Sequence, residues 1–298
     1  MKPQPATLDV IDGRPTLRFE RLLDHPPEKV WRAVTEPDEL AQWFPARVET
    51  ELRVGASMVF VFEDAPLDQT PGGEIIELDP PKVFAYRWGE DVLRWEILPE
   101  DGGCRLLFTH ALSQAHGGAA AAARNAAGWD ECLAALTARL DQRLPSRQVP
   151  MPHRIEDYVE RFGLGRGEIV EGSNGWVLRF VRDLVWNPPE RAWAALTGGA
   201  AVAVGQPPPY SVTVDGLEAG AVTAAAEPNL LEYDWLDGGA RAGRVRWEIT
   251  ADPLAGTRLV LIQTVPSRLP QVPPAVLPAW QERLNRYFAD LFTDGQPG

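Results

Sequence analysis

The sequence predicts an α+β protein of two tandem domains, each a curved antiparallel sheet wrapped around a long C-terminal helix. Three observations support this prediction: the chain repeats its own motifs, its strands follow one another through short turns, and each repeat ends in an amphipathic helix. The length of 298 residues also fits two domains of ordinary size.

The same motifs recur in the same order in both halves of the chain. Arg94-Trp95-Glu96-Ile97 recurs as Arg246-Trp247-Glu248-Ile249, an offset of 246 − 94 = 152. Other matched pairs are Trp31 with Trp193, Tyr86 with Tyr233, Trp88 with Trp235, and Trp129 with Trp280. Because chance matches would not stay collinear, we expect homologous domains at residues 1–146 and 165–298, joined by a linker with a short helix at residues 147–164.

The offset between matched residues changes along the chain and locates the differences between the copies. It is 193 − 31 = 162 at Trp31 but 233 − 86 = 147 at Tyr86, so the second copy lacks 162 − 147 = 15 residues. The deletion lies between Thr197 and Gly220, opposite residues 36–72, and is too long for a turn, so it must remove structure. A later rise of 152 − 147 = 5 indicates a longer turn near residues 237–240.

Turn residues and alternation define the elements of the first copy. Asp12-Gly13 is a hairpin turn between strands at residues 7–11 and 16–23. Pro26-Pro27-Glu28 begins a helix, since Pro suits a first turn and Glu its positive end, and Glu36-Pro37-Asp38 begins a second short helix at residues 39–44. Further strands are expected at residues 48–52, 58–63, 74–78, 83–88, 92–98 and 105–110.

A long helix from about residue 119 to 144 completes the copy. Its apolar stripe comprises Trp129, Cys132, Leu133, Leu136 and Leu140. A sheet with one apolar face must be covered, and this helix is the only cover available. A Pro-rich linker and an amphipathic helix over residues 153–162 follow, and we expect that helix to pack on one domain or between the two.

Composition excludes several classes of function. The net charge of 29 − 42 = −13 argues against a surface that holds nucleic acid or anionic lipid. Cys104 and Cys132 are too few for a disulfide framework, so we expect free thiols and a cytoplasmic location. No apolar stretch is long enough for a membrane span, and no signal sequence is expected.

The first copy resembles the START-like, or SRPBCC, superfamily with its helix-grip fold. Within it, the copy is most similar to the family named for the activator of heat-shock protein ATPase. The resemblance covers nearly all of residues 16–144 and rests on His25-Pro26-Pro27-Glu28-Lys29-Val30-Trp31, Trp43-Phe44-Pro45, Val54-Gly55-Ala56, residues 73–81, Tyr86 and Trp88, Trp95-Glu96-Ile97, Gly103-Cys104-Arg105-Leu106, and Thr109-His110. The second copy lacks the Trp-Phe step, which in this family helps to wall a pocket, so its interior is expected to be closed, shallow or purely structural.

Strand alternation and the resemblance together give the first copy an aromatic interior. The expected ligand contacts are Trp43, Phe44, Phe60, Phe62, Tyr86, Trp88, Trp95, Phe108, His110 and Trp129. The alternative is a filled core without a cavity, because aromatic residues inside a sheet are core residues first. His110 is either a satisfied core histidine or a ligand contact, and Gln263 keeps a polar side chain at its counterpart.

The leading hypothesis is non-enzymatic binding of a small apolar or aromatic molecule in the first domain. No cofactor, metal site or catalytic residue is expected, because nucleophile elbows, phosphate loops and paired histidine spacings are missing from the sequence. One alternative is a cyclase-like or hydrolase-like enzyme that uses His110 or Tyr86 as acid or base. Another, implied by the family name, is a regulatory protein that binds the bacterial chaperone homologue. The repeat further suggests a pseudo-dimer of the two domains within one chain, which is compatible with a monomeric protein.

Overall fold

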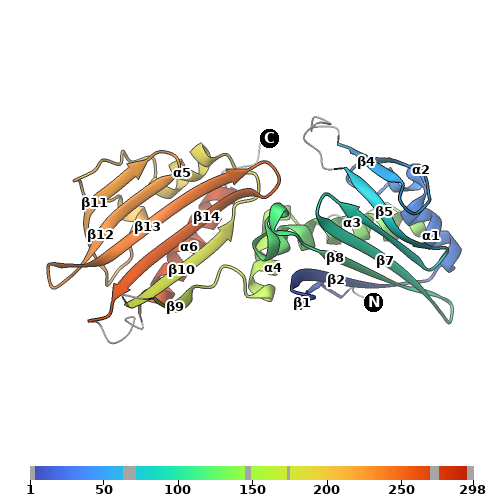
Figure 1. Ribbon diagram of the computed structural model, residues 1–298, viewed down its shortest axis with the longest axis horizontal. Helices are drawn as coiled ribbons and strands as arrows, with labels where there is room; N and C mark the ends of the chain where they lie inside the picture. The colour runs from blue at the N-terminus through green and yellow to red at the C-terminus, as the bar shows by residue number, and fades with distance from the viewer. Residues whose placement is uncertain (1–3, 63–71, 145–148, 173–174, 269–274, 294–298) are drawn as a thin grey trace. The chain divides into compact units, whose positions relative to one another are not determined.

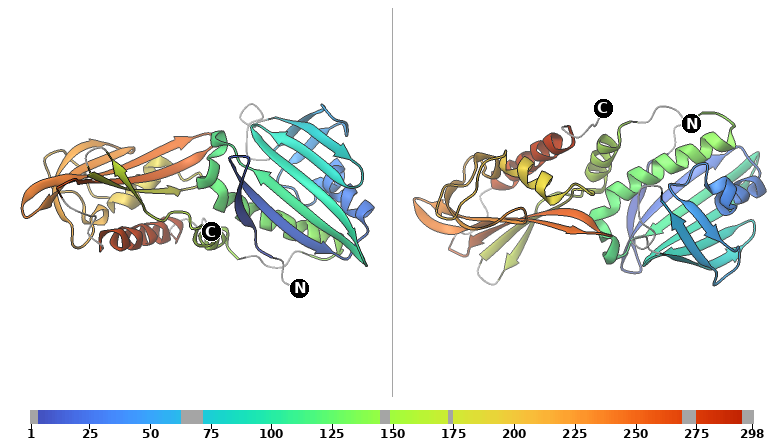
Figure 2. Two further views of the ribbon diagram at one scale, coloured as in Figure 1. Left: turned by 60° about the horizontal axis from the view of Figure 1, so that its bottom comes forward. Right: turned by 90° about the horizontal axis from the view of Figure 1, so that it is seen from above.

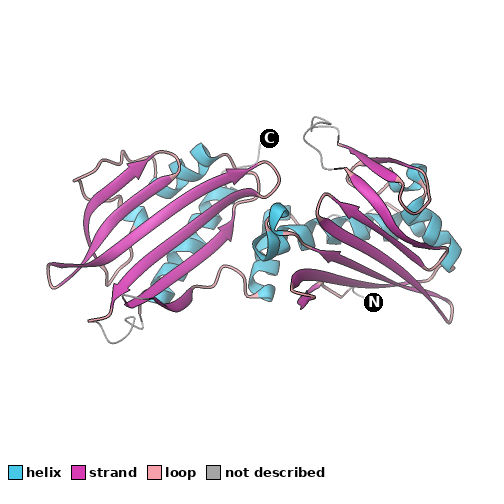
Figure 3. Ribbon diagram, in the orientation of Figure 1, coloured by secondary structure: helices cyan, strands magenta, loops and turns pink. Residues whose placement is uncertain are grey.

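The computed structural model describes residues 4–62, 72–144, 149–172, 175–268 and 275–293 (Figure 1). The chain divides into two compact units, Met1–Phe162 and Gly163–Gly298. Each unit combines one antiparallel sheet with helices, so the predicted α+β class is confirmed (Figure 3).

The first unit contains an eight-stranded sheet in the order β1-β2-β8-β7-β6-β5-β4-β3. Its strands are β1 (Thr7–Ile11), β2 (Arg14–Leu23), β3 (Arg47–Thr50), β4 (Ser57–Val61), β5 (Gly73–Asp79), β6 (Val83–Trp88), β7 (Asp91–Glu100) and β8 (Gly103–Ala111). Asp12 and Gly13 both have positive φ, which the predicted tight hairpin between β1 and β2 requires. Strands β3 to β8 therefore form a meander, and β8 at its end pairs with β2.

Helices lie on one face of this sheet (Figures 1 and 2). They are α1 (Pro27–Thr35), α2 (Pro37–Leu40), the 3-10 turns η2 (Gln114–His116) and η3 (Gly118–Ala121), α3 (Ala122–Leu140) and α4 (Met151–Phe162). Leu133 and Leu136 of α3 are each 1% exposed, which confirms its predicted buried stripe.

The second short helix differs from its predicted bounds. It begins at Pro37, where the fixed φ of proline suits a first helical position, and ends at Leu40 rather than at residue 44. Trp43 and Phe44 therefore follow the helix in tighter turns, with their amide N–H groups 3.1 and 2.8 Å from the Leu40 carbonyl oxygen.

The second unit contains a six-stranded sheet in the order β11-β12-β13-β14-β10-β9. Its elements are β9 (Glu168–Gly172), β10 (Gly175–Asp183), α5 (Pro189–Thr197), η4 (Tyr210–Val212), β11 (Glu218–Ala226), β12 (Leu230–Asp237), β13 (Ala240–Asp252), β14 (Gly256–Pro266) and α6 (Val276–Thr293). Within the described residues, nothing in this unit corresponds to α2, β3 and β4. The deletion inferred from the offsets thus removes one short helix and two strands.

Helix α4, expected in the linker, packs on α3 within the first unit. Tyr158 is 4% exposed; its hydroxyl donates to Asp130 of α3 and accepts the Ala6 amide N–H at 3.0 Å. Arg154 adds an ion pair of 2.6 Å to Glu131. These contacts make α4 part of the body that contains the first sheet.

Candidate functional site

The ten residues expected to contact a ligand form one continuous cluster in the first unit. The ring of Phe44 lies at its centre, with centroid distances of 5.6 Å to Trp43, 6.1 Å to Phe60, 5.9 Å to Trp88 and 5.8 Å to Trp129. Ring contacts continue to the remaining members, which are Phe62, Tyr86, Trp95, Phe108 and His110. The cluster therefore connects the turn after α2, the sheet and α3.

Most of the cluster is buried, and its rings pack directly against one another. Phe62 and Trp88 are half-buried, while the other eight side chains are at most 7% exposed. Trp95 and Phe108 stack with their ring centroids 3.8 Å apart. The aromatic side chains thus fill much of the interior that they were expected to line, and Phe62 and Trp88 form its rim.

A small cavity remains inside the cluster. Its volume is about 10 Å³, which is room for about one water molecule. It is lined by Val34, Leu40, Phe44, Val48, Met58, Phe60, Phe84, Tyr86 and Trp95. Four of these are among the ten predicted contacts. The other five lining residues, Val34, Leu40, Val48, Met58 and Phe84, were not among the predicted contacts.

One wall of the cavity comes from the segment that the second unit lacks. Five lining residues lie in residues 36–72, namely Leu40, Phe44, Val48, Met58 and Phe60. Among the described residues, β4 pairs with β5 at Ser57 and Met58, and Gly55 and Ala56 just before β4 exchange backbone hydrogen bonds with Ile75 of β5. This wall is therefore bonded to the main sheet through residues 55–58 within the described part of the chain.

Trp43 holds the wall against α1. Its indole N–H donates to the Ala33 carbonyl at 2.8 Å, and its ring meets Trp95 edge-on with centroids 5.8 Å apart. The Trp-Phe step thus anchors the turn with one ring and contributes the other, Phe44, to the cavity.

Tyr86 supplies the hydroxyl group of the cavity lining. It is 2% exposed, and burial raises the pKa of its hydroxyl well above the usual range. The Trp95 side chain, which hydrogen-bonds the Tyr86 oxygen, opposes this rise without cancelling it. Tyr86 therefore stays protonated, so it can donate a hydrogen bond into the cavity.

His110 lies outside the cavity lining and is held at both ring nitrogens. The Trp129 indole N–H donates to Nδ1 at 3.0 Å, and Nε2 lies 2.8 Å from an Asp91 carboxylate oxygen. Because an indole can only donate, Nδ1 carries no proton and Nε2 must donate to Asp91. With both nitrogens engaged, His110 has no free position for acid or base chemistry, so its geometry is that of a satisfied core histidine.

Asp91 is the polar residue that sequence reasoning missed. Besides His110, its carboxylate meets His116 Nδ1 at 3.0 Å and accepts the Ser113 amide N–H at 2.6 Å. Burial alone would raise the pKa of Asp91, but these hydrogen bonds together hold it well below its usual range. The alternation that places Trp95 inward also places Asp91 inward, and this signal could have found it.

No group of three or more His, Cys, Asp or Glu side chains is placed to hold a metal ion within the described ranges. Cys104 and Cys132 are both free, as expected. Burial raises the pKa of Cys104 to about 11 and that of Cys132 to about 12. Thiols with such pKa values are poor nucleophiles near neutral pH. Among the described helices, none is long and apolar enough to cross a membrane.

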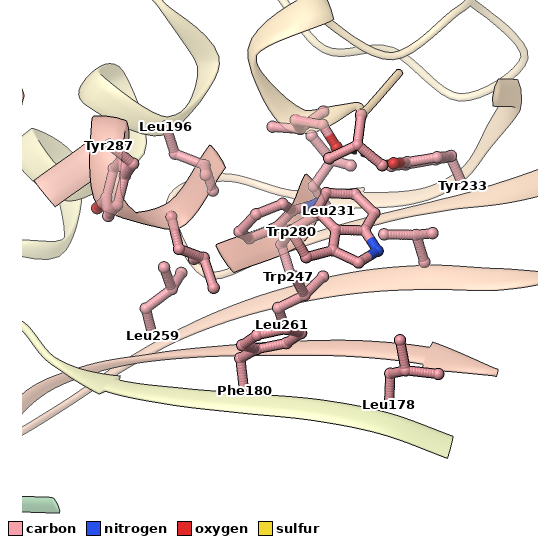
Figure 4. Packing of buried hydrophobic residues seen from close by; sticks show 14 of the residues in the cluster. Leu178, Phe180, Leu196, Leu231, Tyr233, Trp247, Leu259, Leu261, Trp280 and Tyr287 are labelled. Carbon is pink, nitrogen blue, oxygen red and sulfur yellow. Dashed lines mark hydrogen bonds between the residues drawn. The ribbon is translucent and has the colours of Figure 1, made fainter. Parts of the chain in front are cut away.

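Buried hydrophobic side chains occupy the equivalent region of the second unit. Figure 4 shows Tyr233 and Trp247, the counterparts of Tyr86 and Trp95, packed among leucine side chains. Val212, in the segment that replaces the deletion, is completely buried, and its carbonyl oxygen accepts the Tyr233 hydroxyl at 2.8 Å. At the position of His110, Gln263 accepts the Trp280 indole N–H at 2.6 Å.

Comparison with known families bears on the first unit. A family model described as Activator of Hsp90 ATPase homolog 1-like protein matches residues 24–141, from just before α1 to the end of α3. The match spans every element that surrounds the cavity, and it confirms the resemblance of the first unit to this family that was inferred from the sequence motifs.

Solved structures of several bacterial proteins are similar to part of the chain. A conserved protein of unknown function from Enterococcus faecalis is 21% identical, with a TM-score of 0.46 over 53% of this chain and 90% of its own. CalU16 from Micromonospora echinospora is 17% identical, with a TM-score of 0.40 over 53% and 93%. A protein from Mesorhizobium loti is 23% identical, with a TM-score of 0.37 over 43% and 97%. A search of curated proteins finds no match to this chain.

Proposed function

We propose that the first unit binds a small apolar or aromatic molecule between its sheet, its α1–α2 wall and α3, without catalysing a reaction. The observation that carries this proposal is the cavity lined by eight apolar side chains and Tyr86. Ligand sites are commonly apolar hollows with a few placed polar groups, and this cavity has that composition.

Binding requires that the cavity grow, since about 10 Å³ holds no organic molecule. The wall formed by β3 and β4 is the part that moves outward in this proposal, because β3 is the edge strand of the sheet and has no strand on its other side among the described residues. Phe62 and Trp88, the half-buried pair with ring centroids 5.8 Å apart, stand at that end of the cluster. We therefore propose that a ligand enters beside them and displaces β3 and β4.

The test is native mass spectrometry and calorimetric titration of the full chain with a panel of lipids and aromatic metabolites. Val34→Phe adds a ring to the cavity wall and should abolish binding. Leu196→Phe, at the equivalent position of the second unit, is the matched control and should bind like the parent protein. Each bound molecule should be recovered chemically unchanged.

Equal binding by the parent protein and by a folded Val34→Phe variant would place the ligand elsewhere and contradict the proposal. An absence of binding across the panel would also count against it. A bound molecule recovered as a reaction product would replace the non-catalytic proposal with an enzymatic one.

A further inference from the structure

Tyr86 is 2% exposed and lines the cavity, and no described residue accepts a hydrogen bond from its hydroxyl. The Trp95 side chain hydrogen-bonds the hydroxyl oxygen and so lowers its pKa against the larger effect of burial. An indole N–H donates and cannot accept, so this bond uses a lone pair of the Tyr86 oxygen and leaves its proton available. A donor polarised in this way by a second donor is strengthened in a low-dielectric interior.

The second unit shows which group satisfies the equivalent hydroxyl. Tyr233 occupies the same register as Tyr86, since Tyr233 pairs with Val245 as Tyr86 pairs with Leu93. Its hydroxyl donates to the Val212 carbonyl at 2.8 Å. Two apolar residues that follow in the same segment are also buried, with Val214 5% exposed and Leu217 7% exposed. In the second unit, the acceptor for the Tyr233 hydroxyl is therefore a neutral backbone carbonyl with apolar neighbours.

We propose that the ligand of the first unit is a neutral, largely apolar molecule with one carbonyl group, whose oxygen accepts a hydrogen bond from Tyr86. The ligand carbonyl would take the place that the Val212 carbonyl occupies in the second unit. This inference rests on the proposed binding function and specifies the class of ligand.

The lining of the cavity favours a neutral ligand over a charged one. No cationic side chain is among the nine lining residues, and burial of an unpaired carboxylate is costly. The rings of Phe44, Phe60 and Trp95 form apolar surfaces that suit a flat, unsaturated substituent on the carbonyl.

The experiment compares two probes of the same ring skeleton, 1-indanone and indane, by ligand-observed NMR titration of the full chain. The parent protein should bind the ketone about ten-fold more tightly than the hydrocarbon, as one added hydrogen bond from a buried donor predicts. Tyr86→Phe should remove this preference, so that the ketone and the hydrocarbon bind with similar affinity. Tyr233→Phe, the matched variant of the second unit, should keep it.

Infrared spectroscopy gives a second readout. The carbonyl stretch of 1-indanone should move to lower frequency on binding to the parent protein and to Tyr233→Phe, but not on binding to Tyr86→Phe. Indane binding to Tyr86→Phe shows that the cavity of that variant is intact.

Equal affinity of the parent protein for both probes, or a ketone preference that survives in Tyr86→Phe, would overturn the carbonyl inference and leave the binding function standing. Failure of both probes to bind the parent protein would overturn the two proposals together.

Discussion

Asp91 connects three parts of the first unit at the residue scale. Through His110 it reaches β8 and Trp129 of α3, and through His116 and the Ser113 amide it fixes η2. A buried carboxylate is stable only when such donors surround it. The hydrogen bond to Asp91 also raises the pKa of His116, although partial burial opposes this rise.

The stability of the first unit should therefore depend on pH. The contribution of His116 is fully present below its ordinary pKa of about 6.5 and is lost as the pH rises through its raised folded-state value. The contribution of Asp91 is present above its ordinary pKa of about 3.9 and is lost as the pH falls through its lowered value. The free energy of unfolding from the pair should be largest between these limits and decrease toward alkaline pH.

Urea unfolding of the full chain at about pH 6 and about pH 9 measures this dependence. His116→Gln should lose the part of the decrease that arises from His116, while His153→Gln on the exposed side of α4 should keep it. The same pH dependence in His116→Gln and the parent protein would show that another group is responsible.

Phe60 and Phe62 offer a second comparison between single residues. Phe60 is 1% exposed and lines the cavity, so Phe60→Ala should lower the free energy of unfolding by about 3–5 kcal/mol. Phe62 is half-buried at the rim, and Phe62→Ala should cost clearly less. Denaturant titration of both variants provides the values, and equal losses would mean that Phe60 is not a core residue.

At the scale of elements, β3 and β4 differ from the rest of the first sheet. They form one end of the sheet, where β3 is the edge strand and pairs with β4 over four residue pairs. Their inward residues Val48, Met58 and Phe60 form a cavity wall. A buried apolar face on strands at the edge of a sheet suits a wall that moves when a ligand binds.

Amide hydrogen exchange should reveal this difference. The amides of β3 and β4 should exchange faster than those of β7 and β8, which lie inside the sheet and share nine residue pairs. A bound ligand should slow exchange in β3 and β4, whereas β13 and β14 of the second unit should not change. Mass spectrometry of peptic fragments measures both effects, and uniform protection across the first sheet would argue against an opening at β4.

At the scale of the whole molecule, the two units share a plan of antiparallel sheet and helices. Arg94 and Glu96 form an ion pair on the outer face of the first sheet, and Arg246 and Glu248 form the same pair in the second at 2.5 Å. The interiors differ, because the first unit has a wall formed by β3 and β4 whereas in the second a segment with the buried residues Val212 and Val214 stands at that place. A pseudo-dimer of the two units stays a prediction.

Fragments of the chain can separate the role of α4 from that of the second unit. A fragment of residues 1–146 lacks α4 and exposes the part of α3 that Ile155 and Tyr158 cover, so it should aggregate. A fragment of residues 1–162 should be monomeric in size-exclusion chromatography with light scattering. Aggregation of both fragments would instead indicate that the second unit is required, as the pseudo-dimer hypothesis states.

Much of the site could be predicted because it depends on short-range patterns. Alternation placed Tyr86, Trp95 and Phe108 on the inner face, and all three are buried there. Alternation does not report the distances between side chains, so the size of the cavity could not be predicted. The part played by Asp91 was missed because its three donors come from separate elements.

The sequence by itself determined the two tandem α+β units, the missing wall of the second unit and the aromatic composition of the first interior. These features follow from motif order, offsets and strand period, which are properties of neighbouring residues. Only the tertiary structure decided that the rings fill much of the interior and that both ring nitrogens of His110 are hydrogen-bonded. It also decided that the Val212 carbonyl accepts the hydrogen bond of the Tyr233 hydroxyl in the second unit. Those facts depend on packing and hydrogen bonding between residues far apart in the chain, which no local pattern encodes.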